Sequence, residues 1–241
     1  RKTLKILVNE YNAGNAFVVN KKGFIVAYQR ANSNKSGTGV DVNFRPYFQQ
    51  GIKGIPNVYA AVGTSTGKRG MYFAAPIYQE TNSNGPIIGV IVIKIKPERL
   101  DNLLGKLGGP ALLLSPQKVV YSADTPERLF QVSRNINDDL QSELNRYKQF
   151  GKMFVDNAPK PLGFKLTTSL VHMEGLEYAI STQPINWNDP LGEWTLALLS
   201  DREKWFSKQA FVSLGGGVFI LFLILFTMGF AALKGRYYNN I

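Results

Sequence analysis

The chain has 241 residues, 44% of them hydrophobic, which suits one large folded domain or two small ones. It has no cysteine and only one histidine, His172, which excludes disulfides, thiolate chemistry and a multi-histidine metal site. Most of the net charge of +11 lies in residues 1–100, with 14 basic and 4 acidic side chains against 14 and 13 in residues 101–241. This basic part indicates an anionic partner: nucleic acid, anionic lipid or a small acid.

The first hundred residues predict a small α+β sheet with its helices on one side. Residues 1–10 have the apolar spacing of a helix, and residues 15–20 and 24–28 predict a hairpin. Apolar side chains over 44–54 have helical spacing, with Gly54 as a stop signal. Three further strands are predicted over 57–62, 71–78 and 87–95.

The next hundred residues predict the same outline again. An amphipathic helix over 97–107 connects the two parts. A second hairpin follows, then a charged helix over 136–150. The hairpin strands are predicted over 111–114 and 119–122, and three later strands over 164–171, 178–182 and 194–199. The repeat is one of architecture, because no sequence periodicity accompanies it. His172 falls in an alternating strand pattern and is interpreted as structural.

Residues 62–70, VGTSTGKRG, resemble a nucleotide P-loop but depart from its spacing. Gly63 and Gly67 are one residue too close, and Arg69 stands where a hydroxyl should bind magnesium. Two interpretations remain: a plain hairpin turn, or a small anion site made of hydroxyls and backbone N–H groups. Lys68 and Arg69 are expected to be solvated charges of the turn.

Residues 210–233 carry no charged side chain. As a helix they would span about 36 Å, enough to cross a bilayer core of about 30 Å. We therefore predict a transmembrane helix there, preceded by a juxtamembrane segment, 201–209, and followed by the start of a cytoplasmic segment, 234–241. The flanking charges do not fix its orientation.

Four motifs follow one another between residues 44 and 96: Arg45-Pro46-Tyr47-Phe48, Gly63-Thr64-Ser65-Thr66-Gly67, Gly70-Met71-Tyr72 and Val92-Ile93-Lys94-Ile95. In this order they resemble the extracytoplasmic double-Cache, or tandem PAS-like, sensor domains of bacterial transmembrane receptors. The resemblance is strongest to sensor histidine kinases for four-carbon dicarboxylates, and it covers roughly residues 15–200. Met71 in place of an aromatic residue and a longer hairpin at 80–85 depart from that family.

The resemblance implies an α+β fold of two tandem PAS-like modules, each an antiparallel sheet with flanking helices, followed by one transmembrane helix. The ectodomain is expected to comprise the end of an N-terminal signalling helix (1–14), a membrane-distal ligand-binding module (15–96), a connecting helix (97–108) and a membrane-proximal module (109–200).

The resemblance also implies a dicarboxylate site in the distal module. Its charge partners would be Arg45 and Lys94, its hydroxyls would come from Thr64, Ser65 and Thr66, and Tyr47 and Tyr72 would form its walls. The chemistry agrees, because the arginine fork matches a carboxylate. Strand alternation puts Lys94 on the face of Val92 and Lys96, which by itself leaves a ligand-facing or a solvent-facing lysine open.

The implied function is a sensor region without catalytic residues, metal or cofactor. It would bind a small carboxylate outside the bacterial inner membrane, on the periplasmic or extracellular side, and signal as a homodimer through its N-terminal and transmembrane helices. The alternative is an amino-acid sensor of a chemoreceptor or diguanylate cyclase, with Asp41 binding the ammonium group. An enzyme is disfavoured because no nucleophile–histidine–acid set is evident. Nucleic-acid binding is disfavoured because the aromatic residues fall in apolar strand patterns.

Overall fold

The computed structural model describes residues 2–31, 36–63, 67–80, 85–151, 153–155 and 158–202. Residues up to 171, together with 180–200, group into one compact unit that contains most of both sheets. Residues 172–179 group with Asp201 and Arg202 in a second unit. In that second unit, Glu177 accepts a hydrogen bond from Arg202 at 2.6 Å and lies 3.7 Å from the exposed His172.

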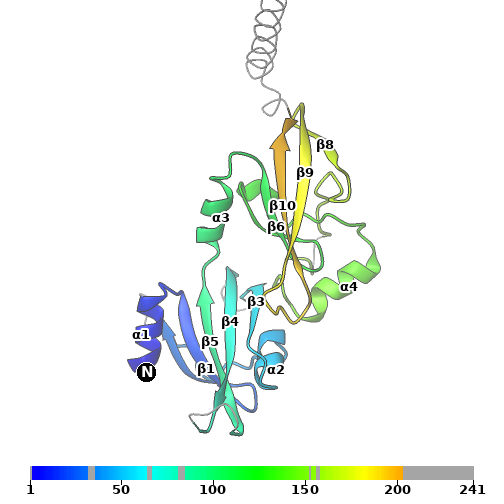
Figure 1. Cartoon of the computed structure of the whole chain (residues 1–241). Helices are drawn as coiled ribbons and strands as arrows, with labels where there is room; N and C mark the ends of the chain where they lie inside the picture. Colours follow the sequence, from blue (N-terminus) through cyan, green and yellow to red (C-terminus); the bar gives the residue numbers. More distant parts are fainter. Residues whose placement is uncertain are drawn as a thin grey trace, which may run out of the picture. The chain divides into compact units, whose positions relative to one another are not determined.

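The first sheet has five strands in the order β2-β1-β5-β4-β3 (Figure 1). All four pairings between neighbouring strands are antiparallel. The strands are β1 (Asn15–Asn20), β2 (Ile25–Arg30), β3 (Asn57–Val62), β4 (Arg69–Tyr78) and β5 (Ile87–Ile95). The predicted hairpin and the three later strands are therefore confirmed, and the first hairpin lies beside the last strand.

The second sheet repeats this strand order as β7-β6-β10-β9-β8. Its strands are β6 (Ala111–Leu114), β7 (Val120–Ala123), β8 (Leu170–Met173), β9 (Leu176–Ile185) and β10 (Trp194–Asp201). Each strand has the same place as the strand five positions earlier in the chain. The predicted repeat of architecture is confirmed. The chain has two antiparallel sheets with few helices, the arrangement of tandem PAS-like modules.

The helices are short and lie where the apolar spacing predicts them. Their bounds are α1 (Lys2–Glu10), α2 (Pro46–Gly51), α3 (Glu98–Leu104), α4 (Asp138–Arg146) and a 3₁₀ turn at Pro126–Arg128. Proline at the first position of α2 suits a helix start, because its missing N–H has no partner there. The side chain of Asn137 caps α4 by accepting from Leu140 N at 3.0 Å.

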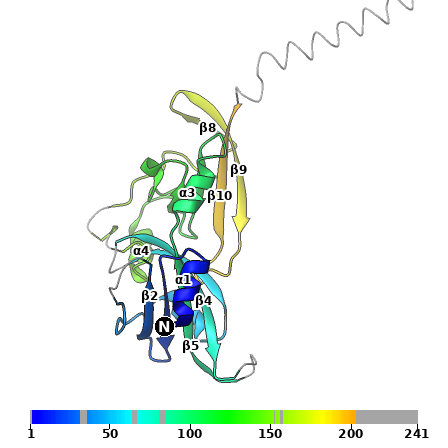
Figure 2. The ribbon, with the colours of Figure 1, turned by 90° about the vertical axis from the view of Figure 1, so that its left-hand side faces the viewer.

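The first two helices cover opposite faces of the first sheet, so the prediction of helices on one side is wrong. Leu4 and Val8 of α1 pack against Ala16, while the next residue of β1, Phe17, packs with Phe48 of α2. Figure 2 shows α1 on the side of the sheet that faces the viewer. Successive strand residues point to opposite faces, so β1 and β5 supply a separate apolar set to each helix.

The second sheet has a core centred on aromatic side chains. Tyr121 and Trp194 are fully buried and meet edge to face, with ring centroids 5.4 Å apart. Leu140 and Leu144 of α4 and the buried Phe150 belong to the same cluster.

The strand predicted over 164–171 is wrong for most of its length, because β8 begins at Leu170. The hydroxyl of Thr168 donates to the carbonyl of Lys165 at 2.7 Å and forms a local turn. A hydroxyl that bonds to nearby backbone in this way competes with strand pairing. Within the described ranges, no helix has the length and apolar character needed to cross a membrane. The predicted transmembrane helix, 210–233, lies outside them.

Candidate functional site

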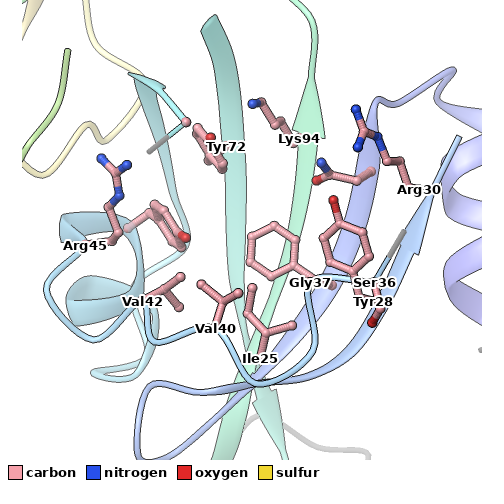
Figure 3. Close-up of a pocket in the computed structure, with 14 residues that line it drawn as sticks. Ile25, Tyr28, Arg30, Ser36, Gly37, Val40, Val42, Arg45, Tyr72 and Lys94 are labelled. Carbon is pink, nitrogen blue, oxygen red and sulfur yellow. The ribbon is translucent and has the colours of Figure 1, made fainter. Parts of the chain in front are cut away.

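A cavity of about 270 Å³ lies on the α2 side of the first sheet (Figure 3). Its apolar floor includes Phe17, Ile25 and Val42. Its polar lining comes from β1, β2, β4, β5, the start of α2 and the segment at residues 36–37. These polar groups are Asn15, Tyr28, Arg30, Ser36, Arg45 and Lys94, together with the hydroxyl groups of Tyr47 and Tyr72.

Strand register brings four of these side chains into one row across the sheet. Asn15 of β1 pairs with Arg30 of β2 on one side and with Lys94 of β5 on the other. Lys94 in turn pairs with Tyr72 of β4. Residues directly opposite each other in neighbouring strands point to the same face. The row therefore presents a guanidinium, an amide, an ammonium group and a phenol to the cavity.

Arg45 enters the cavity from the start of α2, at the position just before the first helical residue. It is only 4% exposed. Its Nη1 donates to the carbonyls of Tyr147 at 3.4 Å and Lys148 at 3.1 Å, and its Nη2 donates to the carbonyl of Val62 at 3.2 Å. Backbone carbonyls thus fix the guanidinium, but none of them neutralises its charge.

Lys94 is the second buried cation and is only 7% exposed. Its Nζ donates to the carbonyl of Lys68 at 3.3 Å and lies 5.2 Å from the centre of the Tyr72 ring. Burial, together with the positive charges of Arg45 and Arg30, lowers the pKa of Lys94 to about 8. The surroundings therefore disfavour the ammonium form, as expected of a buried cation that has no anion beside it.

Tyr47 and Tyr72 form an aromatic wall beside the two cations. Their rings are stacked, with centroids 5.2 Å apart and planes 5° from parallel. Burial raises the pKa of Tyr72 to about 12 and raises the pKa of Tyr47 further. Both phenols therefore keep their protons at neutral pH and can donate hydrogen bonds to an anion.

The cavity is electrostatically incomplete. Among the described residues, no Asp or Glu side chain lines it, and neither Arg45 nor Lys94 forms an ion pair. Buried charges in folded proteins are normally paired, because taking an unpaired charge out of water is costly. An anion of small size would supply the missing charge.

The structure brings four of the seven predicted site residues to this cavity: Arg45, Tyr47, Tyr72 and Lys94. The prediction that Lys94 shares the face of Val92 is confirmed, because Val92 lies in the core beneath α2. Thr64, Ser65 and Thr66 lie outside the described residues. Their neighbour Gly63 lines the cavity, and its N–H donates to the carbonyl of Lys68 at 2.9 Å.

Sequence reasoning missed four polar residues of the lining: Asn15, Tyr28, Arg30 and Ser36. Three of them lie in the first hairpin, where nothing in the local sequence distinguishes them from other strand residues. They can be identified only from the pairing of β1 with β5, a long-range contact that puts the hairpin beside Lys94.

The expectation about Arg69 is wrong. Arg69 is not a solvated turn charge, because it forms a two-point ion pair with Asp101 at 3.1 and 2.7 Å and donates to the carbonyl of Tyr121 at 2.6 Å. Asp41, named above for the amino-acid alternative, is not one of the described residues that line the cavity. It is exposed, and its carboxylate accepts from the N–H of Asn43 at 2.8 Å, capping a turn before α2.

Comparison with known proteins places this geometry in context. No family model matches the chain. It is 25% identical over 198 residues to the C4-dicarboxylate transport sensor protein DctB of Pseudomonas aeruginosa, and 24% identical over 148 residues to DctB of Rhizobium meliloti. These matches cover 81% and 61% of the chain. The chain spans only 28% and 23% of the length of these relatives.

Solved structures show the same fold. The sensor domain of the Vibrio cholerae histidine kinase DctB matches with a TM-score of 0.68 at 23% identity, covering 83% of this chain and 77% of that one. The ligand-binding domain of the Campylobacter jejuni chemoreceptor Tlp3 matches with a TM-score of 0.55 at 18% identity, over 84% and 70% of the two chains. The resemblance predicted from the sequence is confirmed: the chain is homologous to part of the DctB C4-dicarboxylate sensor proteins and has the fold of tandem Cache-type sensor domains.

Proposed function

We propose that this chain is the ligand-sensing region of a bacterial receptor and binds a small dicarboxylate in the cavity of its first sheet. The observation that carries the proposal is the pair of buried cations, Arg45 and Lys94, which line one cavity to which the described part of the chain contributes no acidic side chain. A dianion would neutralise both charges. The guanidinium of Arg45 offers a planar fork for a carboxylate, and Lys94 offers three N–H donors.

A four-carbon dicarboxylate is the favoured ligand. Both DctB relatives are named as C4-dicarboxylate transport sensor proteins. The cavity also suits a molecule with an anionic group at each end. The aromatic wall of Tyr47 and Tyr72 would pack against the short carbon chain between the two carboxylates, and the phenols would donate to them.

An amino-acid ligand is the alternative, because structural neighbours were solved with such ligands. The domain of Tlp3 holds 4-methylisoleucine, and that of the Pseudomonas fluorescens chemoreceptor CtaA holds L-leucine. An ammonium group needs an acceptor of negative charge, however, and no acidic side chain of the described residues lines this cavity. With Asp41 turned to solvent, the charges of the cavity favour a dianion over a zwitterion.

The signal would leave the sensor region through the segment 210–233. Its uncharged length suits a bilayer crossing. With the family resemblance as the guide to orientation, the two sheets would lie on the periplasmic or extracellular side of the inner membrane. The output would be a histidine kinase, the class of protein to which the Vibrio cholerae neighbour belongs. We expect the receptor to work as a homodimer. A ligand shifts such a receptor only by binding one of its two states more tightly than the other.

The test is thermal unfolding of the 241-residue chain in detergent, with succinate, malate, fumarate, valine or leucine added. Ligand that binds the native state raises the melting temperature by mass action. We expect the dicarboxylates to raise it, and Arg45→Ala and Lys94→Ala to abolish the rise. Lys53→Ala, which removes the charge of an exposed lysine after α2, is the matched control and should respond like the unaltered chain. A rise with valine or leucine alone would overturn the dicarboxylate assignment.

A further inference from the structure

Arg30 is a third cation of the cavity, and it lies on the side away from Arg45. Figure 3 shows Arg45 and Arg30 at opposite sides of the cavity, with Lys94 between them. Arg30 ends β2 and is half-buried, and its charge contributes to the lowered pKa of Lys94. The three cations therefore act on one another through the same enclosed space.

The register sets the spacing between these groups. Arg30 and Lys94 lie on strands that flank β1, so their backbones are two strand spacings apart, or about 10 Å. Arg30 and Arg45 approach the cavity from opposite sides, an arrangement that suits two separate carboxylates better than one. Two carboxylates joined by a short chain can reach both, with Lys94 placed to donate to either one.

The amide of Asn15 fills the gap in the row between Arg30 and Lys94. Asn15 is 9% exposed, and its Oδ1 is buried without a hydrogen-bond partner among the described residues. An unpaired buried polar atom is costly and normally marks a place where a partner belongs. This oxygen only accepts, so its partner would be the ammonium group of Lys94 or the guanidinium of Arg30, and Nδ2 of the same amide is the atom that can donate to a carboxylate held between the two cations.

We infer that Arg30, with Asn15, holds the second carboxylate of the ligand, while Arg45 holds the first and Lys94 contacts both. This assignment rests on the proposed function and adds to it the group that selects dicarboxylates over monocarboxylates. The group that distinguishes a dicarboxylate from a monocarboxylate then lies in the first hairpin.

The test compares succinate with succinamate, in which a neutral amide replaces one carboxylate, on the 241-residue chain in detergent. Dissociation constants come from titrations of the melting temperature. We expect Arg30→Gln to weaken succinate about tenfold, the size of one lost charged hydrogen bond, and to change succinamate less than about twofold. Arg30→Lys should retain part of the succinate affinity, because it keeps the charge but loses the fork.

Two controls make the outcome decisive. Lys22→Gln removes the same charge from the exposed turn of the same hairpin and should leave both ligands unchanged. The unliganded melting temperatures of Arg30→Gln and the unaltered chain should agree. If Arg30→Gln weakens both ligands equally or neither, the role of Arg30 is refuted, while a continued requirement for Arg45 and Lys94 leaves the proposed function intact. If succinate does not bind the unaltered chain, both proposals fail.

Discussion

Gly70 lies directly against the side chain of Lys94. A β-carbon placed on Gly70 would lie 2.0 Å from Cε of Lys94 and 2.9 Å from its Cγ, closer than real atoms approach. Gly70 is itself anchored, because its N–H donates to the hydroxyl of Tyr121 at 2.8 Å. The absence of a side chain at this strand position is therefore what leaves Lys94 its path into the cavity.

We predict that Gly70→Ala weakens dicarboxylate binding by about tenfold, because the lysine must leave its position and a charge-assisted hydrogen bond is lost. Titration of the melting temperature with succinate measures the effect. Gly105→Ala is the matched control, since a β-carbon there meets its neighbours only at ordinary distances, 3.5 Å or more. Unchanged affinity in Gly70→Ala would show that the ligand does not need Lys94 where the structure places it.

Dicarboxylate affinity should depend on pH through Lys94, whose pKa is lowered to about 8. Below pH 8 the ammonium form is present and can bind the anion, whereas above pH 8 the free amine cannot. We therefore expect the dissociation constant for succinate to rise between about pH 7 and pH 9, while both ligand carboxylates stay ionised. Lys94→Arg should bind without this dependence, and a dependence that persists in that variant would assign it to another group.

The two buried cations should have opposite effects on stability without ligand. Arg45→Ala leaves the carbonyls of Tyr147, Lys148 and Val62 without their donor, so the free energy of unfolding should fall by about 2 kcal/mol or more. Lys94→Met removes a buried, unpaired charge and should raise it by about 1 kcal/mol at pH 7. Urea unfolding at fixed pH measures both.

The direction in which the stability depends on pH follows from the lowered pKa of Lys94. Between about pH 8 and its ordinary value of 10.5, the unfolded chain binds a proton that the folded chain does not, so stability rises with pH over that window. Lys94→Met should lack this rise. Equal losses of stability in the Arg45 and Lys94 variants would contradict the description of Lys94 as a cation without a counter-charge.

Protonation of Asp189 in mild acid should stabilise the folded chain rather than destabilise it. Its buried carboxylate accepts from Leu191 N at 2.8 Å and Trp194 Nε1 at 2.9 Å, yet burial raises its pKa from 3.8 to about 6. Between those values the folded chain binds the extra proton, so the contribution of Asp189 to stability falls as pH rises from about 4 to 6. Asp189→Asn keeps an acceptor without the charge.

The measurement for Asp189 is the difference in urea midpoint between Asp189→Asn and the unaltered chain at pH 4.5 and pH 7. We expect the variant to gain relative stability at pH 7, because only there does the unaltered chain carry the buried charge. A difference that does not change with pH would show that the carboxyl does not titrate in this range.

Local pattern predicted most of the fold. Alternation identified the strands of the first sheet and the face of Lys94, and the helical spacing of Phe44 and Phe48 located α2. Local pattern could not predict which strands pair, and this pairing decides the rest. Arg30 was not predicted as a site residue, because only the pairing of β1 with both β2 and β5 places it in line with Lys94.

Two further misses share that cause. Asp101 lies 32 residues beyond Arg69 in α3, so their ion pair depends on tertiary contact and leaves no trace in the sequence of the turn. The two-sided cover of the first sheet was not predicted either, because the face that each helix covers is set by long-range contacts, those of Ala16 with α1 and of Phe17 with α2. The roles assigned to Thr64, Ser65 and Thr66 stay predictions.

The row that joins Arg30, Asn15, Lys94 and Tyr72 has a consequence for changes in chain length. Side chains alternate between faces with a period of two, so inserting or deleting one residue within β1 would turn Asn15 toward α1. The row between Arg30 and Lys94 would then lose its amide, although the number of strands would be the same. Ligand recognition in this chain should tolerate many single substitutions in the sheet but no slip of its hydrogen-bond ladder.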